Sequence, residues 1–365
     1  MAPVILELKK RPCFDVKVCV TAQHREMLDM MLKAFGIEPD IDLNIMRSGQ
    51  TLFDITSRAL NGLGEAFAVE KPDMVLVHGD TATTFSAALA AFYSSVKLGH
   101  VEAGLRTFDK YQPYPEEMNR KLTAGLADIN FAPTGLAKAN LLAENIPEES
   151  IFVTGNTAID AVSYTVSPGD YAFEEEALNG VDFSGKKVIL MTAHRRENLG
   201  APLENIFRAA KRLLDGDNDL FLIYPVHLNP LVSEPARRIL GGHGRVLLTN
   251  PVGLKDMHNL ISRSFLIMTD SGGLQEEAPA LRKPVVVLRN VTERPEGIAA
   301  GTLKLAGTEE REVYETAAEI IGDKAEYNAM AGAKNPFGDG RASERIADAL
   351  EYYFGINGKR PEDFS

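Results

Sequence analysis

The sequence predicts an α/β protein in which parallel sheets are covered by helices on both faces. Short apolar runs rich in β-branched residues alternate with amphipathic helical stretches, first from about residue 16 and again after residue 185. Such alternation is typical of parallel sheets, because the crossover between two parallel strands usually contains a helix. The length of 365 residues favours two domains, each large enough to bury its own core.

The first half opens with a strand predicted over 16–20 and a helix over 25–35. Apolar residues recur at helical spacing through that helix, and Gly36 supplies a stop signal. Further helices are predicted over 51–68 and 86–94. Strands of the fully buried type are predicted over 74–78, 128–131 and 151–154.

The second half repeats the pattern with five predicted strands separated by helices. These strands cover 187–191, 220–224, 246–249, 265–268 and 284–288. The irregular stretch 164–186, which contains Ser167-Pro168-Gly169-Asp170, is the predicted linker. We therefore expect one domain over residues 1–165 and a second over 186–340, followed by a C-terminal helix and tail over 341–365.

The composition is that of an ordinary globular protein, with 45% apolar and 25% charged residues. The net charge of −12 argues against a nucleic-acid surface, which needs clustered Lys and Arg, but not against a nucleotide ligand. Two cysteines, Cys13 and Cys19, are too few for a disulfide framework and suit a reducing compartment. Because no signal segment opens the chain and no apolar run approaches ~20 residues, we expect a cytoplasmic protein without a membrane partner.

Polar clusters follow the predicted strands at their carboxyl ends, where open parallel sheets bind ligands. A single carboxylate there could be a helix cap, and Asp80, just before Thr81, is a plausible one. Several carboxylates and two His-bearing loops converging from two sheets favour a shared active cleft between the domains. The clusters cover residues 78–84, 99–107, 114–120, 192–198 and 225–230.

The segment 269–277 is the most informative of these strand-to-helix junctions. Gly272 and Gly273 let the backbone approach a ligand closely, and the free N–H groups of the helix start favour an anion. Glu277, one turn into the helix, can accept hydrogen bonds from ribose hydroxyls, and Arg294 can add positive charge. A lone Gly-Gly could be an ordinary turn, but the whole set predicts a site for a nucleoside diphosphate.

Eight motifs then occur in one order along the chain: HGDTATT, HVEAGLRT, PEEMNR, TGNT, HRREN, YPVHLNP, TDSGGLQEE and TERPEG. Their combination resembles the non-hydrolysing UDP-N-acetylglucosamine 2-epimerases over nearly the whole sequence. The resemblance implies two Rossmann-like domains in the GT-B arrangement with the substrate in the interdomain cleft. It also implies that a C-terminal helix over 342–354 crosses back onto the first domain.

The resemblance implies reversible epimerisation of UDP-N-acetylglucosamine and UDP-N-acetylmannosamine at carbon 2. UDP is eliminated to give 2-acetamidoglucal and then added back, with the proton returned to the opposite face. Asp80, Glu102 and Glu116 match the family's catalytic carboxylates, and His194 matches a histidine that contacts the diphosphate. We expect the carboxylate pKa values to be raised by desolvation and like charge.

Further site residues are carried over in the same way. Ser271, Gly272 and Gly273 are expected to hold the diphosphate, Glu277 the ribose, and Arg294 the phosphate or sugar. Val252 and Met257, in the loop 250–257, are expected to contact uracil. Gln23, Arg195 and His227 match a regulatory site for a second UDP-N-acetylglucosamine, and His78 and His100 are expected to be structural. No cofactor or metal is expected, because the acids and histidines lack ligand spacing.

The start of the chain departs from the family pattern. Relatives begin with a β-strand and a Gly-Thr-Arg-Pro-Glu loop before the Met-Ala-Pro with which this sequence opens. The first strand and its anion-binding loop are therefore expected to be missing, with an unpaired sheet edge as the consequence.

Alternative functions remain open from the sequence. The chain could be an inactive nucleotide-sugar-binding homologue, or a hydrolysing epimerase that releases N-acetylmannosamine and UDP. A glycosyltransferase of the same fold is disfavoured by the three-carboxylate set. The leading prediction is an epimerase that acts on UDP-sugars as a homodimer and supplies surface polysaccharide synthesis.

Overall fold

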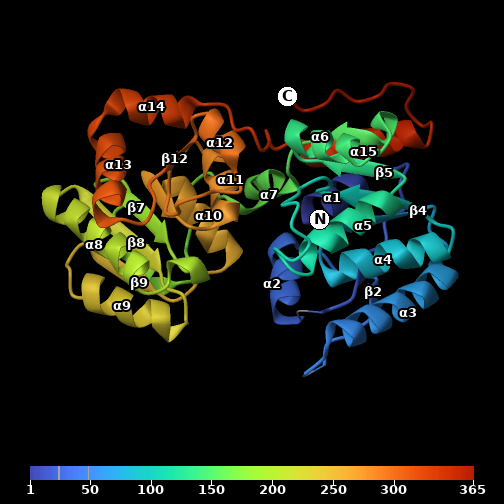
Figure 1. The fold of residues 1–365 in the computed structure, drawn as a ribbon, viewed down its shortest axis with the longest axis horizontal. Coiled ribbons are helices and arrows are strands. Elements are labelled where there is room, and N and C mark those ends of the chain that lie inside the picture. Colours follow the sequence, from blue (N-terminus) through green and yellow to red (C-terminus); the bar gives the residue numbers. More distant parts are fainter. Residues whose placement is uncertain (24, 48) are drawn as a thin grey trace. The chain divides into compact units, whose positions relative to one another are not determined.

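The computed structural model describes residues 1–23, 25–47 and 49–365, which form two compact units. Unit 1 contains residues 1–164 and 338–365, and unit 2 contains residues 165–337. Each unit is a parallel sheet flanked by helices (Figure 1), which confirms the predicted fold class. Within the described residues, no helix is long and apolar enough to cross a membrane.

Unit 1 is built on the four-stranded parallel sheet β3-β4-β5-β6, while β1 and β2 form a separate parallel pair. The strands are β1 (Cys19–Val20), β2 (Ile41–Asp42), β3 (Met74–His78), β4 (Lys97–Val101), β5 (Ile129–Ala132) and β6 (Ile151–Val153). The helices are α1 (Ala2–Lys9), α2 (Arg25–Phe35), α3 (Leu52–Glu70), α4 (Ala82–Tyr93), α5 (Glu116–Leu126), α6 (Gly135–Ala143), α7 (Thr157–Thr165) and α15 (Ala342–Tyr353). Among the described strands, only β4 pairs with β3, which is therefore an edge strand of this sheet.

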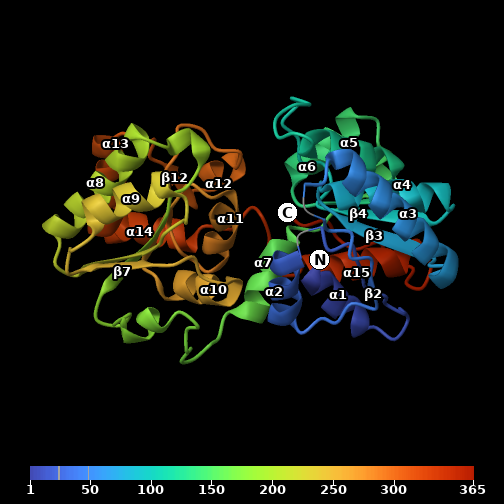
Figure 2. The same ribbon diagram turned by 90° about the horizontal axis from the view of Figure 1, so that it is seen from below.

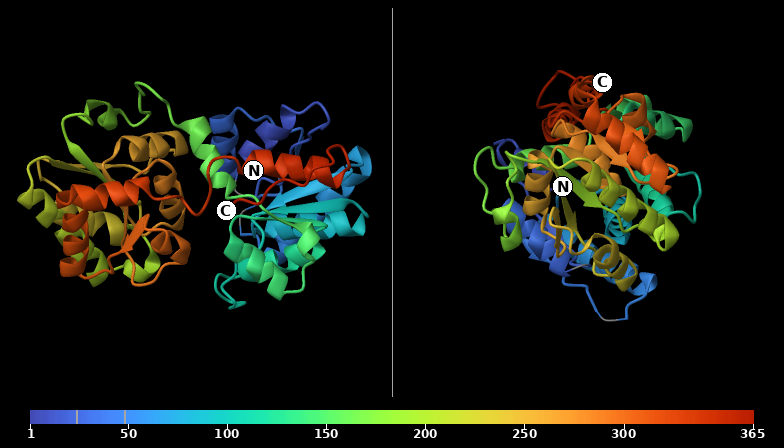
Figure 3. Two further views of the ribbon diagram at one scale, coloured as in Figure 1. Left: turned by 90° about the horizontal axis from the view of Figure 1, so that it is seen from above. Right: turned by 90° about the vertical axis from the view of Figure 1, so that its left-hand side faces the viewer.

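The sheet of unit 1 is covered on both faces because side chains of a strand alternate between them. In β5, Ile129 and Phe131 pack against the face formed by α1 and α15. Ala132 packs against α5 and α6 on the opposite face. Figure 2 and Figure 3 show α15, from the far end of the sequence, beside α1. The C-terminal helix thus completes the core of unit 1.

Unit 2 has a six-stranded parallel sheet with the order β9-β8-β7-β10-β11-β12. Numbered within the unit, this order is 3-2-1-4-5-6, that of a doubly wound Rossmann sheet. The strands are β7 (Lys187–Thr192), β8 (Leu220–Pro225), β9 (Val246–Thr249), β10 (Leu266–Thr269), β11 (Val285–Val287) and β12 (Leu303–Leu305). The helices are α8 (Ala201–Gly216), α9 (Pro230–Leu240), α10 (Leu254–Arg263), α11 (Gly272–Ala280), α12 (Pro295–Ala299), α13 (Glu310–Gly322) and α14 (Lys324–Gly332).

Alternation along the strands divides the core of unit 2 into two layers. Ile189 and Met191 of β7 pack with α8, α9 and α13 on one face, whereas Val188 and Leu190 pack with α10 and α11 on the other. The order in which the strands are added reverses between β7 and β10, the two parallel neighbours at the centre of the sheet. The loops after these two strands therefore lie at the topological switch point, where such sheets bind ligands.

The segment that the sequence suggested as a linker instead packs into unit 2. Phe173 and Leu178 are buried in the layer below α10, and the Tyr171 hydroxyl donates to Asp256 at 2.8 Å. The aromatic rings of residues 171–183 supply apolar area that a free linker would leave in water, and their burial stabilises this face. The structural boundary lies between Tyr164 and Thr165.

Candidate functional site

In unit 1, the loop after β3 presents the Asp80 carboxylate to Arg120 rather than to the start of α4. The cap of α4 is Thr81, whose hydroxyl accepts the N–H of Thr84 at 3.2 Å. The Asp80 carboxylate pairs with Arg120, with 2.7 Å between Oδ2 and Nη1. The capping role that the sequence left open for Asp80 is therefore wrong.

Arg120 lies between two of the predicted carboxylates. Its other terminal nitrogen is 3.8 Å from Oε1 of Glu102, and only 11% of its side chain is exposed. Asn119, its neighbour on α5, donates to the backbone oxygen of Asp80 at 2.9 Å. The guanidinium thus supplies positive charge between Asp80 and Glu102.

The backbone at the ends of β3 and β4 brings Glu102 close to this position. β3 and β4 pair in parallel with His78 opposite Val101, so the residues after both strands emerge side by side. Glu102 has a φ of +64°, a conformation that an L-residue with a side chain rarely adopts. Gly79 has a φ of +68°, and a Cβ there would lie 3.1 Å from Oε2 of Glu102. Backbone strain of this kind is often found at functional sites.

His78 and His100 have different surroundings. His100 is fully buried and its Nε2 contacts the oxygen of Gly79 at 2.8 Å, a structural role. Nε2 of His78 is 3.6 Å from Oε2 of Glu102 and 3.4 Å from the hydroxyl of Thr157. Desolvation lowers the pKa of His78 well below its usual value, so its imidazole is neutral at neutral pH. His78 therefore belongs to the carboxylate cluster, a contact that the sequence did not predict.

Glu116 and Glu117 open α5 but have different roles. The carboxylate of Glu117 is buried and accepts the N–H groups of Thr107 and Phe108 at 3.0 and 3.1 Å, which holds the loop before α5. Glu116 lies four residues before Arg120, so helical spacing puts both on one face of α5. That spacing is also the signal by which Arg120 could have been found from the sequence.

In unit 2, Asp270 organises the loop after β7. It follows β10 and is fully buried, and its Oδ2 accepts the N–H groups of His194 and Arg195, both at 2.8 Å. The amide of Asn198 also donates to Oδ2, at 3.1 Å. Nδ1 of His194 is 3.6 Å from Oδ1 of Asp270. Asp270 is the acidic residue of the TDSGG motif. Its place directly after a central strand is the signal that could have indicated it from the sequence.

The start of α11 carries two guanidinium groups close to its free backbone N–H groups. A Cβ placed on Gly272 would lie 3.6 Å from Nη2 of Arg195 and 3.7 Å from Nη2 of Arg294. Ser271 is the N-cap and makes no side-chain capping bond, so the first turn keeps its donors for another acceptor. A glycine, a helix N-terminus and two arginines form the setting that a phosphate group prefers.

Buried contacts hold the two arginines in place. Nε of Arg195 donates to the backbone oxygen of Asp270 at 3.1 Å. Nε of Arg294 donates to the carboxylate of Glu276, which is buried on α11. Both guanidinium groups are therefore oriented before any ligand arrives, which lowers the entropic cost of binding an anion.

Glu277 lies beside a histidine that the sequence did not indicate. Its Oε2 is 3.3 Å from Nε2 of His258, and the buried His258 ring contacts the hydroxyl of Thr165 through Nδ1 at 2.5 Å. Glu277 lies one turn along α11, and its Oε1 is 3.6 Å from the Cβ position of Gly273. The carboxylate is thus fixed on the helix that also carries the anion-binding turn.

The remaining predicted residues lie in both units. Val252 and Met257 are half-buried against the layer of α10 and α11. The ring of His227 stacks on His194 with 5.5 Å between centroids. Gln23, in unit 1, accepts the hydroxyl of Thr83 at 3.2 Å.

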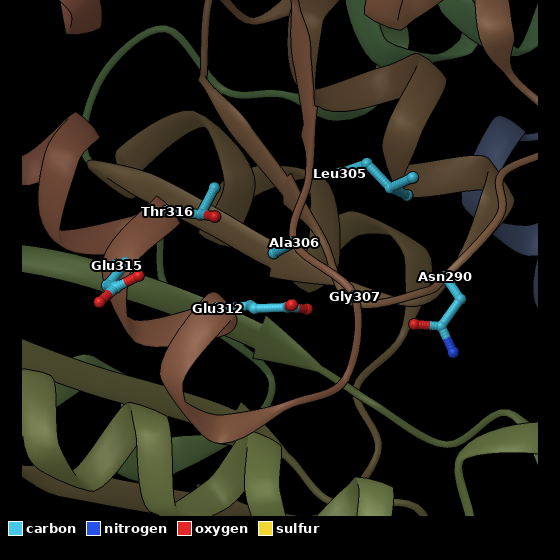
Figure 4. A pocket seen from close by; sticks show the side chains of 7 residues that line it. All are labelled: Asn290, Leu305, Ala306, Gly307, Glu312, Glu315 and Thr316. Carbon is cyan, nitrogen blue, oxygen red and sulfur yellow. The ribbon is translucent and has the colours of Figure 1, made fainter.

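A separate hollow in unit 2 does not fit a nucleotide (Figure 4). This acidic pocket, with a volume of about 400 Å³, is lined by Asn290, Leu305, Ala306, Gly307, Glu312, Glu315 and Thr316. Its charged lining is carboxylate, and the side chains of Glu312 and Glu315 would repel a diphosphate. The switch-point loops, not this pocket, have the charge that an anionic ligand needs.

Comparison with known proteins gives the family of the chain. A family model described as UDP-N-acetylglucosamine 2-epimerase matches residues 6–351. The UDP-N-acetylglucosamine 2-epimerase of Bacillus subtilis is 55% identical over 365 residues, which is 100% of this chain and 95% of that protein.

Solved structures match over the same length. The crystal structure of a putative UDP-N-acetylglucosamine 2-epimerase from Listeria monocytogenes has a TM-score of 0.94 and 52% identity, covering 100% of this chain and 95% of that one. The structure of S. aureus MnaA with UDP has a TM-score of 0.89 and 51% identity, covering 100% and 96%. The chain therefore belongs to the UDP-N-acetylglucosamine 2-epimerase family.

Proposed function

We propose that this protein interconverts UDP-N-acetylglucosamine and UDP-N-acetylmannosamine by inverting carbon 2 of the sugar. The observation that carries the proposal is the pair of carboxylates, Asp80 and Glu102, joined by Arg120 at the strand ends of unit 1. The arginine-flanked start of α11 supports a nucleoside diphosphate as the second part of the substrate. Membership of the epimerase family gives the reaction its type.

The proposed chemistry is elimination followed by addition. A carboxylate removes the hydrogen of carbon 2 as a proton, and the C–H electron pair forms a double bond to carbon 1. The bond from carbon 1 to the UDP oxygen breaks, which leaves 2-acetamidoglucal and UDP. UDP then adds back to carbon 1, and a second group delivers a proton to the opposite face of carbon 2.

Asp80, Glu102 and Glu116 are the groups proposed to move these protons. Inversion needs an acid or base on each face of carbon 2, and the set provides more than one carboxylate. Arg120 keeps Asp80 and Glu102 from repelling each other, since its guanidinium contacts both. The contact of His78 with Glu102 adds a neutral partner that orients this carboxylate.

Residues of unit 2 are proposed to hold the nucleotide and its leaving diphosphate. The N–H groups of Gly272 and Gly273, the Ser271 hydroxyl and the side chains of Arg294 and His194 would stabilise charge that develops on the departing oxygen. Glu277 would bind the ribose hydroxyls, and Val252 and Met257 would provide an apolar surface for uracil.

Incubation with UDP-N-acetylglucosamine in D2O, followed by proton NMR, tests the proposal. We expect UDP-N-acetylmannosamine with deuterium at carbon 2, because the removed proton exchanges with solvent. Product without label at carbon 2 would refute the elimination mechanism. Free N-acetylmannosamine and UDP as the final products would show a hydrolysing enzyme instead.

The wider setting is also part of the proposal. On the family resemblance, we propose a homodimer in the cytoplasm that supplies surface polysaccharide synthesis. Gln23, Arg195 and His227 are proposed to bind a second UDP-N-acetylglucosamine that regulates the reaction. Sedimentation of the purified chain would test the dimer.

A further inference from the structure

Glu293 lies among three arginines at the edge of the anion-binding turn. Its carboxylate oxygens are 3.6 Å from Nη1 of Arg195, 3.5 Å from Nη2 of Arg289 and 3.9 Å from Nη1 of Arg294. One carboxylate thus serves as counter-ion to three guanidinium groups, two of which are those that flank Gly272.

The two ends of each flanking guanidinium face different partners. In both Arg195 and Arg294, Nη1 faces Glu293, whereas Nη2 is the nitrogen nearest to the Cβ position of Gly272, at 3.6 and 3.7 Å. The guanidinium groups therefore lie between the Glu293 carboxylate and the start of α11. An anion bound at the helix start and the Glu293 carboxylate would draw on the same two positive charges.

The contacts of the Glu293 carboxylate are longer than the hydrogen bonds that hold these two arginines, which include one from Nη1 of Arg294 to the backbone oxygen of Glu293 at 3.2 Å. Arg195 is held through Nε by the backbone oxygen of Asp270 at 3.1 Å, and Arg294 through Nε by the buried Glu276. The side chain of Glu293 is 52% exposed, and none of its distances is shorter than 3.5 Å. Exposed ion pairs of this length contribute little and are readily given up, while the buried contacts keep the arginines in place.

We propose that Glu293 is an internal counter-anion of the diphosphate site. Its carboxylate neutralises Arg195 and Arg294 when the site is empty and releases them when a diphosphate binds at the start of α11. This inference rests on the proposed function, since it assumes that the site takes the diphosphate of a UDP-sugar.

The consequence is a site that selects its ligand by charge. A diphosphate can replace one carboxylate as partner of two arginines, whereas a ligand without phosphate leaves Glu293 in place. The competition weakens the binding of UDP, and this favours a reaction in which UDP must separate from carbon 1 and return to it. Glu293 is thereby assigned as a specificity-determining residue.

Titration calorimetry with UDP tests the inference on the whole chain. Glu293→Gln removes the charge and keeps the size of the side chain, so we expect the Kd for UDP to fall by about fivefold, the scale of a few exposed ion pairs. Binding of uridine, which has no phosphate, should not change. Glu312→Gln is the matched control, because it removes one negative charge from the acidic pocket of the same unit; it should change the Kd by less than about twofold.

Thermal unfolding provides a second measurement. If Glu293 is released on binding, Glu293→Gln should lower the Tm of the empty protein but not that of the protein saturated with UDP. Equal or weaker UDP binding by Glu293→Gln would overturn the inference, because the carboxylate would then remain paired in the complex. An equal gain in affinity for UDP from Glu312→Gln would also overturn the inference, since the effect would then come from the net charge of the protein. If the unaltered chain binds no UDP, the proposed function itself fails.

Discussion

Asp80 and Glu102 show how a contact decides between two roles for a carboxylate beside a helix. Asp80 could have capped α4, but Thr81 does so, and both carboxylates turn to Arg120 instead. We expect Asp80→Asn and Glu102→Gln each to lower kcat at least ~100-fold, the usual size of an acid–base contribution. Binding of UDP should change much less. Near-normal turnover in both variants would return the two residues to a structural role.

His258 gives a residue-scale prediction for the nucleotide. Its imidazole lies between the Thr165 hydroxyl and Oε2 of Glu277, 3.3 Å from the latter, so it is placed to orient the carboxylate proposed to bind the ribose. His258→Gln should raise the KM for the UDP-sugar by roughly fivefold, about 1 kcal/mol for the lost contact with that carboxylate, with little change in kcat.

The matched measurement for His258 compares UDP with 2′,3′-dideoxy-UDP, which lacks the ribose hydroxyls. In the unaltered chain, Glu277 should make UDP the tighter ligand, and His258→Gln should narrow that difference. A variant that loses affinity equally for both nucleotides would show that His258 only stabilises α10 and α11.

His100 links a buried residue to the stability of unit 1. Desolvation lowers its pKa to about 3, whereas the unfolded chain has the ordinary value of 6.5. Between these two values the unfolded state binds a proton that the folded state does not, so the free energy of unfolding falls as the pH falls, by up to about 1.4 kcal/mol per pH unit. His100→Gln retains a donor for the Gly79 oxygen but cannot titrate. Urea unfolding across this pH range should give a shallower slope for the variant, and parallel slopes would contradict the assignment.

At the scale of elements, the start of α15 is fixed by a carboxylate from α7. Asp160 is buried and accepts the N–H groups of Ala342 and Ser343 at 3.1 and 2.6 Å, as well as the Ser343 hydroxyl at 2.6 Å. Burial raises the pKa of Asp160, while these hydrogen bonds act in the opposite direction. The contact ties the end of unit 1's first segment to the beginning of its second, residues 338–365.

Asp160→Ala should therefore lower the free energy of unfolding by about 2 kcal/mol or more, since it leaves buried N–H groups without an acceptor. Asp323→Ala is the control, because Asp323 caps α14 through Ala325 and Glu326 at an exposed helix start. Its loss should cost about 1 kcal/mol or less, as water can replace an exposed cap. If chemical unfolding shows that both variants lose the same free energy of unfolding, burial of the cap does not determine how much stability it contributes.

Elements with strong periodicity could be predicted from the sequence, and those defined by their partners could not. The strand predicted over 74–78 and the helix over 25–35 have the observed bounds, because apolar patterns identify them. The strand predicted over 16–20 is reduced to two residues, since its partner β2 is equally short. β12 and the packing of residues 171–183 depend on contacts with the rest of unit 2.

The same division holds for the candidate site. The motifs and strand ends indicated Asp80, Glu102, Gly272 and Glu277. Arg120, Asp270 and His258 were not singled out. Helical spacing and the TDSGG motif mark the positions of the first two, but the partners of all three follow only from distances to other side chains. Sequence thus predicts where a ligand binds better than which residues hold the binding groups in place.

At the scale of the whole molecule, charged residues are unevenly distributed. The chain carries a net charge of −12, yet three arginines gather around Glu293 at the switch point of unit 2. A few local cations are enough for a diphosphate, while the acidic remainder disfavours polyanions such as nucleic acids. This arrangement suits an enzyme that selects small anionic nucleotides.

Regulation by a second ligand is proposed for Gln23, Arg195 and His227. If a second UDP-N-acetylglucosamine binds these residues, the reverse reaction from pure UDP-N-acetylmannosamine should start with a lag, because no activator is present until product accumulates. A small addition of UDP-N-acetylglucosamine should remove the lag, and Gln23→Ala should raise the concentration required. An immediate full rate from pure UDP-N-acetylmannosamine would show that this regulatory site does not operate, while the assignment of the epimerase reaction would stand.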